Sequence, residues 1–207
     1  MKTSRIEEYL DSLFPNPTCE LIYHTDYELL IAVVLSAQST DKRVNQVTPI
    51  LFSRYPTLYD LSNANLEDIE EIIRPVGSFH KKAYYVREIA ALVASHRGMV
   101  PRDREVLMKF PGVGRKTINV FLSEYYQEPA IAVDTHVERI SKRLGLARPK
   151  DDVLIVEKKL MKAFPKEVWG KRHLQMVLFG RYHCKAIKPE CGPCPLKDIC
   201  HEKKKNF

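Results

Sequence analysis

The chain has 207 residues, of which 44% are hydrophobic, and carries a formal net charge of +7 at pH 7 with a pI near 9.1. This length suits one large domain or two small ones, and the apolar run Leu29 to Leu35 is far shorter than the ~20 residues of a spanning helix, which argues against a membrane protein. The positive charge favours a polyanionic partner such as nucleic acid, although a merely soluble basic protein also fits.

Helical periodicity dominates the chain, and strand signals are scarce. An N-terminal helix is predicted from Ile6, Leu10 and Leu13, which share one face. Further helices are predicted over residues 29–35, 41–52, 66–73, 82–96, 104–110, 117–126, 137–144, 153–164 and 171–181. The apolar segment 129–133 is short and is interpreted as an extended linker. The sequence therefore predicts an all-α protein of roughly ten helices.

A glycine-rich turn lies between two of these helices, in the sequence F-P-G-V-G-R-K-T (110–117). Gly112 and Gly114 permit a tight turn with bare backbone N–H groups. Those amides precede a helix N-terminus, which attracts anions, and Arg115 and Lys116 add positive charge there. An ordinary connection between two helices is the alternative, but the whole pattern favours a hairpin that binds phosphate.

Lys116 and Asp134 are the candidate catalytic residues. Lys116 falls in the first turn of a helix, where the macrodipole disfavours an ammonium group and favours a free amine that can form a Schiff base. Phosphate binding is the alternative for this lysine. Asp134 or Thr135 has the position of an ordinary helix cap, and an aspartate that caps a helix can also face a cleft and act in catalysis.

Four cysteines lie close together near the C-terminus with the spacing C-x6-C-x2-C-x5-C, namely Cys184, Cys191, Cys194 and Cys200. This density favours a metal centre over disulfides, because no secretory signal is seen and cytosolic disulfides are rare. Only Cys191 and Cys194 have the paired spacing typical of zinc, so an iron–sulfur cluster is favoured while zinc stays open. Cys19 stands alone and is interpreted as an ordinary thiol.

Together these segments resemble the endonuclease III family of helix-hairpin-helix DNA glycosylases. The resemblance covers nearly the whole chain and rests on L-L-I-A-V-V-L-S-A-Q-S-T-D (29–41), F-P-G-V-G-R-K-T (110–117), I-A-V-D-T-H-V (131–137), and G-R-Y-H-C with the cysteines (180–200). It implies a two-lobed all-α fold. Residues 20–128 would form a six-helix barrel domain with the helix-hairpin-helix motif, and residues 1–19 with 129–207 a domain that holds one [4Fe–4S] cluster per chain on the four clustered cysteines.

The activity that the resemblance implies is excision of oxidised pyrimidines from double-stranded DNA, followed by cleavage at the abasic site. Lys116 would form a Schiff base and nick the strand 3′ to the lesion by β-elimination, with Asp134 as the catalytic carboxylate. Gln38 would help fill the gap left by the flipped base. The DNA backbone would be bound by Gly112, Gly114, Arg115, Lys185 and Lys188. The protein would act as a monomer, in the cytoplasm of a bacterium.

One position departs from the family pattern. Ser78 follows Gly77 where the family usually places a bulky apolar wedge, so either Phe79 takes over this role or the wedge is weak. This departure leaves the preference for lesion and opposite base open.

Two other functions compete with this prediction. A monofunctional adenine glycosylase is opposed by Lys116 and by the expectation that no further domain follows Cys200. A non-enzymatic DNA-binding module with a zinc-bound tail would bind duplex DNA without releasing a base.

Overall fold

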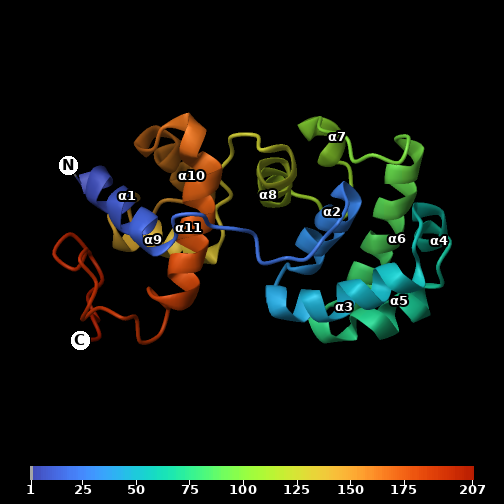
Figure 1. The fold of residues 1–207 in the computed structure, drawn as a ribbon, viewed down its shortest axis with the longest axis horizontal. Helices are drawn as coiled ribbons and strands as arrows, with labels where there is room; N and C mark the ends of the chain where they lie inside the picture. Colours follow the sequence, from blue (N-terminus) through green and yellow to red (C-terminus); the bar gives the residue numbers. More distant parts are fainter. Residues whose placement is uncertain (1) are drawn as a thin grey trace. The chain divides into compact units, whose positions relative to one another are not determined.

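The computed structural model describes residues 2–207, and all regular secondary structure in this range is helical, which confirms the predicted all-α class. The chain divides into two compact units, drawn in Figure 1. One, the hairpin unit, is Cys19–Tyr126. The other, the cysteine unit, combines the residues up to Thr18 with Gln127–Phe207.

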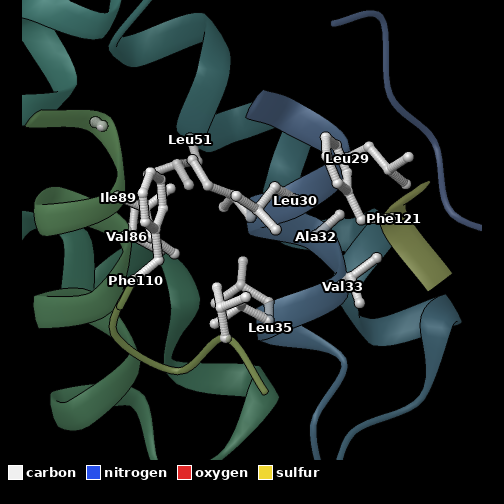
Figure 2. Packing of buried hydrophobic residues seen from close by; sticks show 14 of the residues in the cluster. Leu29, Leu30, Ala32, Val33, Leu35, Leu51, Val86, Ile89, Phe110 and Phe121 are labelled. Atoms are coloured by element: carbon white, nitrogen blue, oxygen red, sulfur yellow. The ribbon is translucent and has the colours of Figure 1, made fainter. Parts of the chain in front are cut away.

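The hairpin unit is built around α2 (Asp26–Leu35), which is buried on all sides. A helix that is apolar around its whole circumference belongs in a core. Figure 2 shows Leu29, Leu30, Ala32, Val33 and Leu35 of this helix among side chains from other helices. Three helices pack against it: α3 (Asp41–Arg54), α6 (Phe79–Ser95) and α8 (Arg115–Tyr126). The unit also contains α4 (Leu58–Ser62), α5 (Leu66–Ile73), the 3-10 turn η1 (Arg74–Val76) and α7 (Arg104–Leu107).

Side-chain caps determine where several of these helices begin. Thr25 accepts a hydrogen bond from the Glu28 amide at the start of α2. Asn65 caps α5, where its side-chain oxygen accepts a hydrogen bond from the Glu67 amide. The short helix α4, which the periodicity does not predict, begins with a capping box in which Thr57 and Asp60 satisfy each other's backbone amides.

The cysteine unit packs α1 (Lys2–Leu13) against α11 (Trp169–Tyr182), although about 160 residues separate them. Ile6 and Leu10 are fully buried in this contact. Arg172, itself buried, donates to Asp11 at 2.8 Å. The unit also contains α9 (Thr135–Arg143), α10 (Val153–Ala163) and the 3-10 turn η2 (Lys166–Val168).

Most predicted helices are present, and the differences lie at their ends. The helix predicted over 104–110 ends at Leu107, and Phe110 lies in the turn that follows. The helix predicted from Lys82 begins at Phe79. Residues 127–134 have no regular secondary structure, as expected for an extended linker. None of the helices in residues 2–207 is long and apolar enough to cross a membrane.

Candidate functional site: a glycine hairpin and a cysteine-lined cavity

The hairpin is a tight turn that joins α7 to α8 and is fixed to the core by two apolar side chains. Phe110 and Val113 are buried, and the Val113 amide donates to the Phe110 carbonyl at 3.1 Å. Gly112, between them, has φ +76°, a conformation that favours glycine. Anchored on both sides, the turn holds a fixed shape in front of α8.

The amide end of α8 faces solvent. The carbonyl of Gly114 accepts the first hydrogen bond of the helix from Ile118 at 3.0 Å, and a Cβ built on Gly114 meets open space. Arg115 and Lys116 are exposed, and the first turn of α8 contains no acidic residue. A helix N-terminus with bare amides and two cations is suited to binding a phosphate group.

Lys116 and Asp134 belong to different units, Lys116 to the hairpin unit and Asp134 to the cysteine unit. Asp134 is the N-cap of α9, where its Oδ1 accepts from the Val137 amide at 2.8 Å. Its Oδ2 makes no hydrogen bond within residues 2–207, so capping leaves half of the carboxylate available. The alternative cap, Thr135, is not used.

The four clustered cysteines line one cavity in the cysteine unit. Cys184, Cys191, Cys194 and Cys200 all border it, and none of them is in a disulfide bond in residues 2–207. No three ligand-type side chains in residues 2–207 converge as a single metal ion requires. Burial raises the pKa of the Cys184 and Cys194 thiols in this environment.

Two arginines of α9 bind the backbone around the first of these cysteines. Arg143 donates to Cys184 Sγ at 3.4 Å and to the Lys185 carbonyl at 2.7 Å, while its Nε pairs with Glu202 at 2.6 Å. Arg139 donates to the Cys184 carbonyl at 3.2 Å. Sequence reasoning missed both arginines. Their spacing of four residues, which places them on one face of α9, was the available signal.

The predicted DNA contacts of the cysteine loop differ in their surroundings. Lys185 is exposed but donates to Glu190 at 3.1 Å, and Glu190 also contacts His183 at 3.1 Å. Lys188 is exposed, with φ +51°. An ion pair between two exposed side chains is weak, so a phosphate group can displace Glu190 from Lys185.

Gln38 and Ser78 are exposed at the surface of the hairpin unit, and both have positive φ angles, +56° and +47°. Phe79, the alternative wedge, is half-buried against the core, and the Arg74 guanidinium lies 5.7 Å from its ring centre. Ser78 is therefore the exposed tip of this loop.

Comparison with known proteins identifies the family. The chain matches the family of HhH-GPD superfamily base excision DNA repair proteins over residues 31–166. It is 47% identical to endonuclease III of Bacillus subtilis, over 99% of this chain and 95% of that protein, and 42% identical to endonuclease III of Escherichia coli K12, over 92% and 90%.

Solved structures agree with the sequence comparison. A trapped covalent intermediate of endonuclease III with DNA has 50% identity to this chain and a TM-score of 0.92, over 97% of this chain and 96% of the other. A non-covalent complex of endonuclease III with DNA gives the same identity and TM-score. The chain therefore belongs to the HhH-GPD superfamily of base excision DNA repair proteins.

Proposed function

We propose that this protein is a bifunctional DNA glycosylase and AP lyase that removes oxidised pyrimidines from double-stranded DNA. The observation that carries the proposal is the 50% identity, over nearly the whole chain, to an endonuclease III trapped covalently on DNA. The exposed amine of Lys116, held by a rigid turn at the start of α8, is the matching nucleophile in this chain.

In the first step, the lone pair of Lys116 Nζ attacks C1′ of the flipped nucleotide. The bond between C1′ and the base breaks, and the base leaves with the bonding electrons and takes up a proton. Asp134, whose Oδ2 is not used in capping, accepts the proton that Lys116 loses and stabilises positive charge on the sugar. Opening of the sugar then gives a Schiff base between Lys116 and C1′.

In the second step, a proton passes from C2′ to solvent water, and the electrons of that bond drive cleavage of the bond between C3′ and its oxygen. The 3′ phosphate departs as the leaving group, which nicks the strand 3′ to the lesion. Water finally hydrolyses the Schiff base and frees Lys116. No redox partner is required, because β-elimination moves an electron pair within the sugar.

The DNA backbone binds to positive charge and bare amides. We assign phosphate contacts to the turn of Gly112 and Gly114, to Arg115, and to Lys185 and Lys188 of the cysteine loop. Contacts of this kind position a duplex without reading its sequence. Each phosphate that they neutralise releases counterions, so binding is expected to weaken steeply with salt. Gln38 is assigned to the gap that the flipped base leaves.

The cysteine cavity is proposed to hold one [4Fe–4S] cluster. Four free thiols border one cavity, and four cysteine thiolates are the usual ligands of a [4Fe–4S] cluster. Arg143 donates to Cys184 Sγ, and hydrogen bonds to sulfur are typical of such clusters. The cluster would cross-link the four cysteines and so fix the conformation of the loop that carries Lys185 and Lys188.

The domain assignment that we propose is a barrel of residues 20–128 and a cluster domain of residues 1–19 and 129–207. A monomer suffices for this chemistry. Bacterial relatives support a place of action beside the chromosome, in the cytoplasm.

The test uses a duplex with one thymine glycol, incubated with the protein in the presence of borohydride. We expect base release, a nick 3′ to the lesion and a covalent adduct with the wild type, and no adduct with Lys116→Gln. Lys109→Gln, which removes an exposed cation from the same hairpin, should behave as the wild type. Base release without an adduct would indicate a monofunctional glycosylase, and binding alone would indicate a non-enzymatic module.

A further inference from the structure

Lys82 is a buried lysine for which the proposed reaction has no use. It lies in the first turn of α6 and is only 5% exposed. Its ammonium donates to the carbonyl oxygens of Leu35 at 2.9 Å, Ala37 at 2.8 Å and Val76 at 2.9 Å. An ammonium group has three N–H donors, so these three carbonyls satisfy it completely.

The positive charge of Lys82 is unfavourable at the start of its own helix, α6, and favourable at the ends of α2 and η1. A cation in the first turn of α6 meets the positive end of that helix's dipole. The carbonyls that it contacts lie at the C-terminal ends of α2 and η1, where a cation is favoured, and α2 has no basic residue in its own last turn. Lys82 therefore supplies charge to elements other than its own.

Both contacted segments lead directly into exposed residues with unusual backbone conformations. Ala37 precedes Gln38, whose φ is +56°, and Val76 precedes Gly77 and Ser78, whose φ angles are +68° and +47°. Non-glycine residues with positive φ persist only where their surroundings hold them. The Ser78 carbonyl accepts the first backbone hydrogen bond of α6, from the Lys82 amide at 3.1 Å, so the side chain of Lys82 contacts this loop just before the point where the helix begins.

We propose that Lys82 is a positioning residue that locks the loops of Gln38 and Ser78 in the arrangement in which both enter the duplex at a lesion. This proposal rests on the proposed function, which assigns Gln38 to the DNA gap. Extruding a base requires unstacking, and loops that are already in place lower that barrier. Burial lowers the pKa of Lys82, while its three carbonyl acceptors favour the charged form that this role requires.

The test separates opening of the duplex from chemistry and from binding. A duplex carries thymine glycol opposite 2-aminopurine, whose fluorescence rises when it unstacks, and Lys116→Gln serves as the non-reacting background. We expect the fluorescence to rise when Lys116→Gln binds the duplex. When Lys82→Met is added to this variant, the rise should be at least about tenfold smaller, because a displacement of the loops by ~1 Å suffices for a loss of this size. Affinity for undamaged duplex, measured by anisotropy, should change by less than about threefold, since phosphate contacts carry it.

A second readout uses an abasic site in a single-stranded oligonucleotide, where no base pair has to open. Lys82→Met in the otherwise wild-type chain should keep its β-elimination rate within about twofold, while its rate on the damaged duplex falls about 100-fold. A purely structural role would lower both rates together. Lys81→Met removes the neighbouring, exposed charge from α6 and is expected to leave both rates and the fluorescence rise intact.

Lys82→Gln provides a second variant if Lys82→Met does not fold, as judged by circular dichroism. The glutamine side-chain amide has two N–H donors, so it can donate to at most two of the three carbonyls. Lys82→Gln should therefore show the same loss of duplex opening to a smaller degree. Full opening with either folded variant overturns the positioning role. No opening by Lys116→Gln, together with no base release by the wild type, overturns the proposed function and the positioning role at once.

Discussion

Gly112 and Tyr85 approach so closely that the hairpin turn has no room for a side chain. A Cβ on Gly112 would lie 2.5 Å from Tyr85 Cδ2 and 3.1 Å from Val34 Cγ1. Gly112 also has φ +76°, so an L side chain would be strained in any case. The aromatic ring on α6 thus sets how deeply the turn sits against the core, and with it the position of the amides that precede α8.

Gly112→Ala is therefore expected to lower the free energy of unfolding by about 2 kcal/mol or more, from the left-handed backbone and the contact with Tyr85. Gly114→Ala is the matched control, because its Cβ meets open space. Urea unfolding of both variants measures the difference. Equal loss of stability in the two variants would contradict the close packing of the turn.

Asp134 combines a capping role with a proposed catalytic one, and two substitutions separate them. Asparagine caps a helix about as well as aspartate, so Asp134→Asn should keep the thermal midpoint of the wild type while excision slows by about 100-fold or more. Asp134→Ala should lose the same activity and, in addition, about 1 kcal/mol of stability. Unchanged excision by Asp134→Asn would leave Asp134 as a cap alone.

Arg143 is expected to retain the proposed cluster through its hydrogen bonds to Cys184 and Lys185. Arg143→Lys keeps the charge but loses the fork of donors, so the broad absorption near ~400 nm should fade about tenfold faster under oxidation or chelation. Lys142→Gln, on the same helix but paired with Glu138, is the control. A variant and a wild type that fade at the same rate would show that Arg143 does not hold the cluster.

Asp11 makes the stability of the cysteine unit depend on pH. Hydrogen bonds from Arg172, with further ones from Lys171 and Gln175, lower the pKa of Asp11 far below its ordinary value. A lowered carboxylate pKa contributes stability above the unfolded value of about 3.9, and that contribution is lost as the pH falls below it.

Asp11→Asn is therefore expected to be less stable than the wild type at pH 6. The difference should narrow only as the pH falls below about 4, where the aspartate of the unfolded chain becomes protonated, and should vanish as the pH falls through the still lower pKa of the folded protein. Unfolding in urea at several pH values measures the difference in stability between the two proteins. A difference that stays constant over this range would mean that the bonds from Arg172 do not depend on the charge of Asp11.

The sequence predicted the helices well because their apolar residues recur at helical spacing, and it predicted the hairpin because Gly112, Gly114 and Arg115 form a local pattern. It missed α4, which is a single turn set by a capping box and is too short to show a period. It also missed Lys82, Arg139 and Arg143. Most of their partners are backbone carbonyls, many of them on residues distant in the sequence, and the pattern of side chains along the chain does not indicate where a carbonyl will accept a hydrogen bond.

In the proposed reaction, the amine of Lys116 becomes covalently attached to the sugar. The most direct measurement is mass spectrometry of the borohydride-reduced adduct, digested with protease and nuclease to locate the modified residue. We expect one adduct, on the peptide that contains Lys116 and at the side chain of that residue. An adduct on another amine, such as Lys109 or the N-terminus, with the Lys116 peptide unmodified, would contradict it.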